Sequence, residues 1–324
     1  MKTKQLGTTG LQISELCFGT MSFGGDADEA ESGKMFGACR DAGINFFDCA
    51  NVYSNGAAEK ILGKLIGPER DDLIITSKCF GHMGEDINSG GANRRHILKA
   101  VEESLTRLGT DRLDILFMHR WDETVPLEET LRALEKLVAD GKVLHLGASN
   151  YAAWQVAKGL GISERQGWPR FDVLQPMYSL VKRQSEVELF PLALAERLGV
   201  MSYSPVGGGL LSGKYTAKNK PSQARLSTNK MYSDRYGQPW VFETAERFTA
   251  LAEAQNIHPV SLAVKWAGSH TAVTCPIIGA RNLEQLRPSL SSVEIDMTEE
   301  LYQHVSSLSV RPAPATDRLE EQQG

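Results

Sequence analysis

Four ionisable side chains in this sequence have types and spacings suited to acid–base chemistry. The stretch FFDCANVY, residues 46–53, begins as an apolar strand and then carries a carboxylate, Asp48, and a phenol, Tyr53. A carboxylate taken out of water is costly unless a cation or hydrogen-bond donors accompany it. Two later strand-like runs end in Lys78 and His119, and we expect Lys78 to be the partner of Asp48.

These side chains together suit the reduction of a carbonyl group. An ammonium beside a carboxylate satisfies both charges in a site of low dielectric, and its field favours the ionised form of a nearby phenol. We therefore expect the pKa of Tyr53 to lie below the value of about 10 of a free phenol, which improves it as a proton donor. A neutral His119 can donate a hydrogen bond to a carbonyl oxygen and orient it while negative charge develops there.

Eight strand-like apolar runs alternate with segments of helical periodicity and would position these side chains. The runs are residues 16–19, 44–48, 73–78, 113–119, 143–150, 171–178, 200–205 and 274–280. Continuous apolar strands joined by amphipathic helices are typical of a parallel sheet covered by helices, and eight strands are the number of a closed barrel. We predict an α/β fold, a TIM (β/α)8 barrel with all strand exits on one face. An open doubly wound sheet is the alternative, but no G-x-G-x-x-G motif accompanies it.

Three segments depart from this alternation. Residues 2–14 read as two short strands around a Gly-Thr-Thr-Gly turn, an N-terminal β-hairpin plug for the bottom of the barrel. The seventh unit carries a long insertion from Gly207 to about Trp240, and insertions of this length are usually functional or mobile. We expect a single domain over residues 1–324, with a loosely ordered polar tail at 311–324.

Composition narrows the classes of partner. The chain has a net charge of -5 and no block rich in Lys and Arg, so we expect no nucleic acid and no anionic membrane surface as partner. No run approaches the roughly 20 apolar residues that span a bilayer, and we expect a cytoplasmic protein. The five scattered cysteines form no C-x-x-C pair, which argues against a disulfide framework and against a metal site.

The four side chains, in this order and spacing, resemble the catalytic tetrad of the aldo-keto reductase superfamily. FFDCANVY is similar to the family's second-strand motif, and GTDRLDILFMHRWD resembles its fourth unit. The resemblance extends from about Lys4 to about Leu308, and HRWD with GGGLLSGKY is similar to the aryl-alcohol-dehydrogenase-like branch in bacteria and fungi. It implies Tyr53 as general acid, Lys78 and Asp48 as the groups that tune it, and His119 as the group that orients the carbonyl.

The same resemblance implies NADPH as the hydride donor, with NADH less favoured. The residues that match the nicotinamide end of the family's cofactor site are Gly19, Thr20, Asp48, Ser149, Asn150, Gln175, Tyr203, Ser204 and Pro205. Those that match the phosphate and adenosine end are Lys214, Arg225, Gly279, Ala280, Arg281 and Gln285, with the amides of Gly279 and Ala280 expected at a helix start. Pro288 and Ser289 stand where the family commonly has an acid followed by Asn, so a strict preference for NADPH does not follow.

An apolar substrate pocket is expected around the four side chains. Its candidate lining residues follow strand exits and are Met21, Tyr53, Phe80, His119 and Trp121. The sequence leaves open which carbonyl compound is the substrate, the physiological direction, and whether the chain is a monomer or a homo-oligomer.

Three other functions fit parts of the sequence. A regulatory subunit could keep the barrel and its cofactor with little turnover, as channel-associated β subunits of this superfamily do. A barrel enzyme of another kind could use Lys78 as a Schiff-base amine. GGLLSGK, residues 208–214, fits the first seven positions of a P-loop, but Tyr215 stands where magnesium needs Ser or Thr, and a loop-like segment follows in place of a helix.

Overall fold

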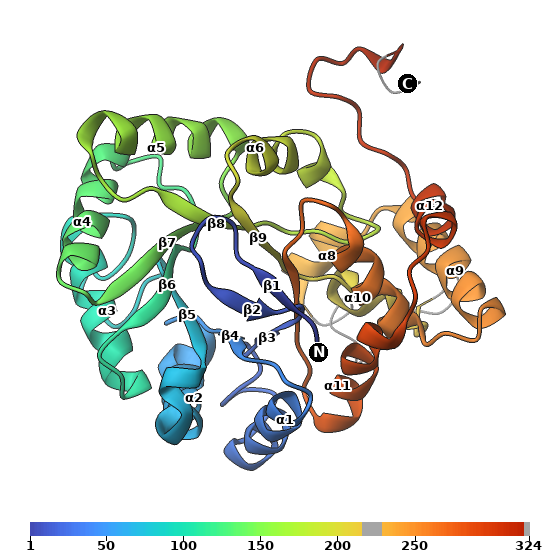
Figure 1. The fold of residues 1–324 in the computed structure, drawn as a ribbon, viewed down its shortest axis with the longest axis horizontal. Coiled ribbons are helices and arrows are strands. Elements are labelled where there is room, and N and C mark those ends of the chain that lie inside the picture. Colours follow the sequence, from blue (N-terminus) through green and yellow to red (C-terminus); the bar gives the residue numbers. More distant parts are fainter. Residues whose placement is uncertain (216–228, 321–324) are drawn as a thin grey trace.

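The computed structural model describes residues 1–215 and 229–320, and its centre is a closed barrel of eight strands (Figure 1). The strands follow one another around the barrel in the order β10-β3-β4-β5-β6-β7-β8-β9, and every neighbouring pair is parallel. Each predicted run overlaps one strand, so the predicted (β/α)8 barrel is confirmed. The strands are β3 (Cys17–Gly19), β4 (Phe46–Asp48), β5 (Ile74–Cys79), β6 (Leu113–Met118), β7 (Val143–Ser149), β8 (Phe171–Gln175), β9 (Gly199–Ser202) and β10 (Cys275–Ile278).

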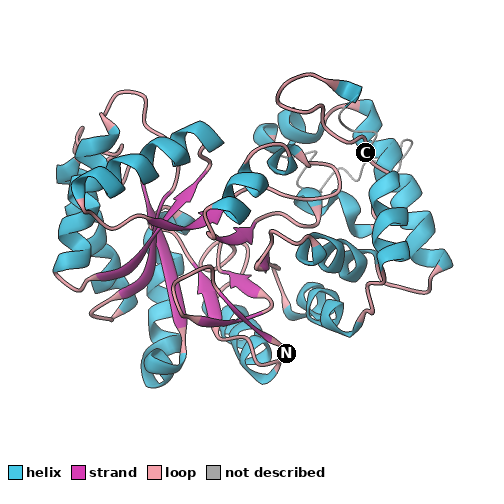
Figure 2. Cartoon of the chain, turned by 45° about the horizontal axis from the view of Figure 1, so that its top comes forward, coloured by secondary structure: helices cyan, strands magenta, loops and turns pink. Residues whose placement is uncertain are grey.

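Helices surround the strands, as Figure 2 shows. Every residue of β4 and β6 is buried, because the interior covers one face of each strand and helices cover the other. The helices among the described residues are α1 (Glu29–Asp41), α2 (Ala57–Ile66), α3 (Arg94–Leu108), α4 (Leu127–Ala139), α5 (Ala153–Gln166), α6 (Leu189–Ala195), α8 (Lys230–Tyr236), α9 (Pro239–Ala254), α10 (Pro259–Ser269), α11 (Leu283–Leu290) and α12 (Glu299–Ser307). None of them is both long and apolar enough to cross a membrane.

Local sequence signals set the ends of helices that cover the barrel wall. The α3 helix begins where the side chain of Asn93 accepts a hydrogen bond from the backbone N–H of His96, and it ends at Gly109, whose φ is 63°. In α4, Leu127, Leu131 and Leu134 recur at spacings of four and three residues, and all are buried. The capping residues at the ends of α3 and the leucine spacing of α4 can both be recognised in the sequence.

The N-terminal hairpin closes the bottom of the barrel. Strands β1 (Thr3–Gln5) and β2 (Gln12–Ser14) pair antiparallel, and Figure 1 shows them crossing the barrel. Leu6 and Ile13 are fully buried in one cluster with interior residues of the barrel strands. Gly7 has a φ of +52°, and a Cβ there would collide with the backbone N of Gly199 at the start of β9. The predicted plug is therefore present at the entrance of the strands, opposite their exits.

The long insertion and the tail are described in part. Within the insertion, the short 3₁₀ helix η4 (Gly207–Ser212) follows β9, and α8 comes after the undescribed residues 216–228. The described part of the tail leaves α12 and runs away from the barrel (Figure 1), and residues 311–318 form neither helix nor strand.

Candidate active site

Asp48, Lys78 and His119 lie together at the mouth of the barrel, the end at which the parallel strands finish. Asp48 is the last residue of β4, Lys78 is the penultimate residue of β5, and His119 directly follows β6. Neighbouring strands are in parallel register, with Asp48 opposite Thr76, so the three exits lie side by side. Tyr53 enters the same mouth from the 3₁₀ helix η1 (Tyr53–Gly56), which follows β4.

Asp48 is buried, and three side chains donate hydrogen bonds to its carboxylate oxygens. The ammonium Nζ of Lys78 lies 2.6 Å from Asp48 Oδ2, and the hydroxyl of Thr76 and the amide Nε2 of Gln175 donate to Oδ1 at 2.7 and 2.9 Å. The side chain of Asp48 is 3% exposed and that of Lys78 is 0% exposed. The expected partnership of Asp48 and Lys78 is present, and it removes most of the cost of burying both charges.

Lys78 is held as a cation and directed at the phenol. Its Nζ donates to Asp48, to the backbone oxygen of Cys49 at 2.7 Å, and to Tyr53 Oη at 3.3 Å. Burial disfavours its charge, but the fields of Asp48 and Tyr53 outweigh burial and raise the pKa of Lys78 above its ordinary value. The ammonium therefore keeps its protons at neutral pH.

Tyr53 differs from expectation in its proton affinity. Burial raises its pKa to about 12, and the field of Lys78 offsets only part of that rise. The prediction of a lowered pKa was wrong, because the charge of Lys78 is already neutralised by Asp48 while the phenolate would lose its hydration. Tyr53 is therefore a neutral phenol near pH 7 that can donate its proton.

His119 is neutral beside Tyr53. Burial lowers the pKa of His119 to about 4, and the nearby positive charge of Lys78 adds to that effect. The rings of Tyr53 and His119 meet edge to face, with centroids 6.1 Å apart and an angle of 79°. A neutral imidazole beside a protonated phenol presents two hydrogen-bond donors to one substrate oxygen.

One hydrogen-bond network joins four of the expected nicotinamide residues to the tetrad. The hydroxyl of Ser149 donates to the backbone oxygen of Gln175 at 2.9 Å, and the amide of Asn150 donates to Ser149 Oγ at 3.1 Å. The hydroxyl of Tyr203 donates to Asn150 Oδ1 at 2.7 Å. Because Gln175 also donates to Asp48, these side chains form a continuous polar wall beside the mouth.

A comparison with known protein families covers most of the chain. The family model described as the aldo/keto reductase family matches residues 15–310. The chain belongs to the aldo/keto reductase family. The predicted family is thereby confirmed.

Individual relatives of this aldo/keto reductase carry names of two kinds. The chain is 33% identical to an uncharacterized oxidoreductase of Bacillus subtilis over 98% of both chains. It is 32% identical to a protein of Schizosaccharomyces pombe named "putative aryl-alcohol dehydrogenase", over 91% of this chain and 92% of the relative. It is 33% identical to a probable voltage-gated potassium channel subunit beta of Oryza sativa subsp. japonica, over 91% of this chain and 92% of the relative. The first two names support an oxidoreductase.

The remaining residues expected at the nicotinamide end surround the same mouth. Thr20 of this aldo/keto reductase donates to the backbone oxygen of Asp48 from its backbone N at 2.9 Å and from its hydroxyl at 3.0 Å. A Cβ on Gly19 would lie 2.9 Å from a methyl group of Ile277, so the strand exit needs glycine. Ser204 and the buried Pro205 follow Tyr203, and Ser204 has a φ of 60°.

The residues expected at the adenosine end are more dispersed. Lys214 and Gln285 are exposed, and Arg225 lies outside the described residues. Helix α11 begins at Leu283 after the N-cap Asn282, so Gly279 and Ala280 precede its first turn. Arg281 Nε lies 3.0 Å from Asp26 Oδ2, and the two side chains are 40% and 48% exposed.

The departure at residues 288–289 has a structural consequence. Pro288 and Ser289 lie in the last turns of α11, and Ser289 is 3% exposed. The backbone oxygen of Pro288 accepts a hydrogen bond from the hydroxyl of Ser261. The side chain of Ser289 is therefore turned into the protein and away from solvent.

The candidate lining residues Met21, Phe80 and Trp121 each follow a strand exit of this aldo/keto reductase. Met21 is 49% exposed, and Phe80 lies beneath the guanidinium of Arg120 at 4.8 Å. Trp121 packs edge-on against Tyr151, with ring centroids 5.5 Å apart, and against Trp154 at 5.6 Å.

Two contacts at the mouth were missed in the sequence. Thr76, which donates to Asp48, lies two residues before Lys78, and the period-two alternation of a strand could have placed both on the interior face. Arg120 stacks on Phe80. The HRWD motif displays Arg120 beside His119, but its stacking partner comes from another strand exit.

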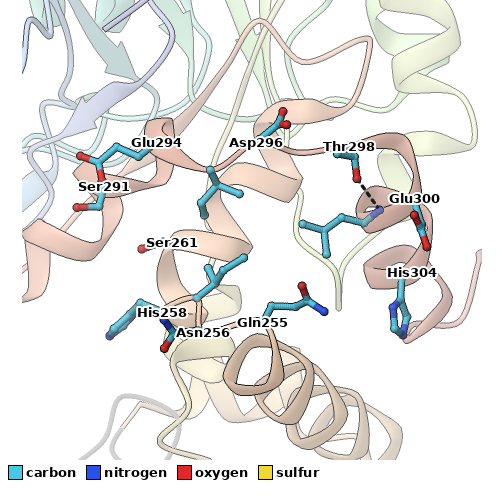
Figure 3. A pocket seen from close by; sticks show the side chains of 13 residues that line it. Gln255, Asn256, His258, Ser261, Ser291, Glu294, Asp296, Thr298, Glu300 and His304 are labelled. Carbon is cyan, nitrogen blue, oxygen red and sulfur yellow. Dashed lines mark hydrogen bonds between the residues drawn. The ribbon is translucent and has the colours of Figure 1, made fainter.

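A second cavity lies apart from the tetrad. It has a volume of about 640 Å³ and is lined by the connection between α9 and α10, the first turn of α10, residues 291–298 and α12 (Figure 3). Its charged and imidazole lining groups are His258, Glu294, Asp296, Glu300 and His304, and none of the tetrad residues lines it. Among the described residues, no group of three His, Cys, Asp or Glu side chains could hold a metal ion. The barrel mouth, where Asp48, Tyr53 and Lys78 are in contact, is the candidate active site.

Proposed function

We propose that this aldo/keto reductase is an NADPH-dependent oxidoreductase that reduces aldehydes or ketones to alcohols, with Tyr53 as the general acid. The observation that carries the proposal is the contact of 3.3 Å between the Lys78 ammonium and the Tyr53 hydroxyl, next to a neutral His119. A family model over residues 15–310 and relatives named as oxidoreductases support the reaction class.

The residues around the mouth fit a nicotinamide cofactor. A carboxamide needs both a donor and an acceptor, and the side chains of Asn150 and Gln175 with the hydroxyl of Ser149 supply both kinds of group. The phenol ring of Tyr203, tied to Asn150 at 2.7 Å, would lie against the nicotinamide ring. When bound, the reduced nicotinamide supplies hydride to the carbonyl carbon.

The protein's own contribution is proton transfer and charge stabilisation. The imidazole of His119 and the hydroxyl of Tyr53 would donate hydrogen bonds to the carbonyl oxygen and hold it in place. As electrons move onto that oxygen, Tyr53 gives it the phenolic proton. The Lys78 ammonium then stabilises the phenolate that remains, and Asp48 keeps Lys78 oriented.

The cations at the far end support NADPH over NADH. Lys214 would face the pyrophosphate, and Arg281 would pair with the 2'-phosphate, for which a guanidinium fork is well suited. Arg225 is proposed from the sequence alone.

Steady-state turnover across a panel of carbonyl compounds tests this function. Aromatic aldehydes, sugar aldehydes and dicarbonyls are each mixed with the protein and either NADPH or NADH, and the absorbance of the reduced nicotinamide is followed. We expect at least one compound to be reduced, with a lower KM for NADPH than for NADH. A panel without turnover, in a protein that binds NADPH, would contradict the proposal.

A second candidate function is favoured by the relative named as a potassium channel subunit beta, which is 33% identical to this chain. In that case the chain would bind NADPH and a partner protein while reducing carbonyls slowly. The two functions differ in the effect of Tyr53→Phe, because a regulatory subunit would keep both cofactor binding and partner binding in that variant. A pull-down from the host that yields no stoichiometric partner would exclude the second candidate.

A further inference from the structure

A buried carboxylate lies behind the strand that carries Lys78. Glu59, in the first turn of α2, is 0% exposed and accepts hydrogen bonds from Ser77 Oγ at 2.5 Å and from Arg107 Nε at 2.6 Å. Successive strand residues face opposite sides of a sheet. Ser77 therefore faces the helices while Lys78 faces the barrel interior, and Glu59 is bound to the back of the same strand.

The position of Glu59 is consistent with its electrostatic effect on two thiols. Burial raises the pKa of Cys49 and of Cys79, and in both cases the negative charge of Glu59 adds to the rise. Cys49 directly follows Asp48, and Cys79 directly follows Lys78. Ser77, which donates to Glu59, directly precedes Lys78, so the carboxylate lies behind the strand exit that carries Lys78.

Arg107 connects this carboxylate to the loop that carries Tyr53. Its side chain is 14% exposed and comes from the last turn of α3, a helix that packs against α2. A Cβ on Gly56 would lie 2.9 Å from Arg107 Cδ and 3.2 Å from Arg107 Nε. Arg107 therefore packs directly under the last residue of η1 while it pairs with Glu59.

The segment above Arg107 has an unusual backbone. Ser54, Asn55 and Gly56 have φ values of 47°, 51° and 87°, three consecutive residues in the left-handed region. Residues other than glycine adopt this conformation at a cost, and such segments persist where the surroundings over-determine them. Tyr53 stands at the start of this segment, and Glu59 stands three residues beyond its end.

We propose that the buried Glu59–Arg107 ion pair is a positioning unit that holds the segment 53–56 so that Tyr53 Oη stays in reach of Lys78 Nζ. The inference rests on the proposed role of Tyr53 as proton donor. A buried ion pair contributes little net stability compared with apolar residues of the same size, so stability alone gives no reason for these charges at this place. Neither residue contacts the reacting atoms, and both act through Tyr53.

A second buried ion pair supplies the matched control. Arg70 Nη2 lies 2.9 Å from Asp114 Oδ2, with side chains 11% and 6% exposed, and Asp114 also accepts a hydrogen bond from the backbone N of Ile75 at 2.8 Å. This pair joins β6 to the start of β5, at the end of the strands opposite the mouth. It matches the Glu59–Arg107 pair in burial and charge but lies far along the strand from Lys78.

The test compares Glu59→Gln with Asp114→Asn in the full-length protein. We expect Glu59→Gln to lower kcat about 10- to 100-fold with little change in the KM for NADPH, the scale that a displacement of about 1 Å of a reacting group produces. Asp114→Asn should lower the Tm to a similar degree and keep kcat. In a Tyr53→Phe background, Glu59→Gln should produce no further loss of rate, because the group it positions is gone.

Hydrogen exchange of the peptide 49–56 gives a readout that does not depend on turnover. The backbone N–H groups of Asn51 and Tyr53 donate to Lys78 O and Ala50 O at 3.2 and 3.1 Å, and they should exchange faster in Glu59→Gln but not in Asp114→Asn. If the wild type reduces no carbonyl compound, the proposed function fails while this exchange measurement still decides the positioning role. If Glu59→Gln does not fold, Glu59→Leu/Arg107→Met takes its place, since an apolar pair restores stability without the hydrogen bonds.

Two outcomes would overturn the proposal. One is a variant without the ion pair that keeps wild-type kcat and wild-type exchange in residues 49–56. The other is an equal loss of kcat in Glu59→Gln and Asp114→Asn, which would reduce the effect to general destabilisation.

Discussion

The two ends of the proposed cofactor site differ in how firmly burial and hydrogen bonds hold their side chains before a cofactor binds. At the nicotinamide end, Asp48 and Lys78 are buried and hydrogen-bonded, and Gln175 extends the network across the barrel to β8. At the adenosine end, Arg281 is 40% exposed and is paired with an equally accessible Asp26. The residues of the first end are on barrel strands or directly follow them, whereas those of the second are on longer connections and on α11.

This difference has a physical reason. Proton transfer requires groups within hydrogen-bond distance and an environment in which charge is not screened by water, which the barrel interior supplies. Recognition of a phosphate requires only that cations reach a dianion, and long side chains on loops can do so from solvent. Substitutions at the nicotinamide end should therefore change kcat, and substitutions at the adenosine end should change the KM for NADPH.

The largest effect is expected for Lys78→Met. The change leaves Asp48 buried without its cation, and we expect a loss of about 3–5 kcal/mol in the free energy of unfolding. We also expect kcat to fall about 10²- to 10⁴-fold, because no group remains to stabilise the phenolate of Tyr53. Adding Asp48→Asn should recover stability but not kcat. Recovery of both in the double variant would contradict a catalytic role for the pair.

His119→Ala should lower kcat/KM about 10²- to 10³-fold, the usual cost of removing one donor to a developing oxyanion. The pH profile gives a second check. Since the pKa of His119 is about 4 and that of Tyr53 about 12 in the protein without substrate, wild-type kcat/KM for the carbonyl compound should fall only below about pH 4 and above about pH 12. A titration of kcat/KM near pH 7 would contradict the assigned protonation states.

Arg281→Ala tests the other end of the site. We expect the KM for NADPH to rise about 10-fold, the scale of one charge-assisted hydrogen bond, while kcat and the KM for NADH stay unchanged. The effect should shrink in high salt because the guanidinium is exposed. An equal rise in KM for both cofactors would show that Arg281 does not discriminate the 2'-phosphate.

The smallest effect is expected for Asp26→Asn. Its ion pair with Arg281 is half exposed and contributes at most about 1 kcal/mol. Releasing Arg281 should lower the Kd for NADPH by about 5-fold or less and leave the Tm unchanged, as measured by quenching of protein fluorescence and by thermal melting. Weaker binding of NADPH in this variant would mean that Asp26 assists the site instead of competing for Arg281.

The fold could be predicted because its signals are local and repeated. Each barrel strand is a short apolar run, and chemically distinct residues such as Asp48 and His119 stand at the strand exits. The start of α11 could also have been predicted, since Asn282 followed by Gln285 is a capping signal and Asn282 caps the helix. The expectation that the amides of Gly279 and Ala280 lie at a helix start overlooked that signal, since both residues precede the N-cap Asn282.

Other features depend on distances that no sequence pattern contains. The pKa of Tyr53 is set by the balance between loss of water and the field of Lys78, and spacing along the chain indicates only the second of these. The contact of Glu59 with Arg107 joins residues 48 positions apart on different helices. The left-handed backbone from Ser54 to Gly56 packs against Arg107, a residue about 50 positions later in the chain, and no local sequence pattern indicates this contact.

The most direct test of the account is the rate of NADPH oxidation by wild type and by Tyr53→Phe with a carbonyl compound that the wild type reduces. Removing one hydroxyl group should lower kcat about 10²- to 10⁴-fold while the Kd for NADPH and the Tm stay at wild-type values. A Tyr53→Phe protein that oxidises NADPH at the wild-type rate would contradict the assignment of Tyr53 as the proton donor.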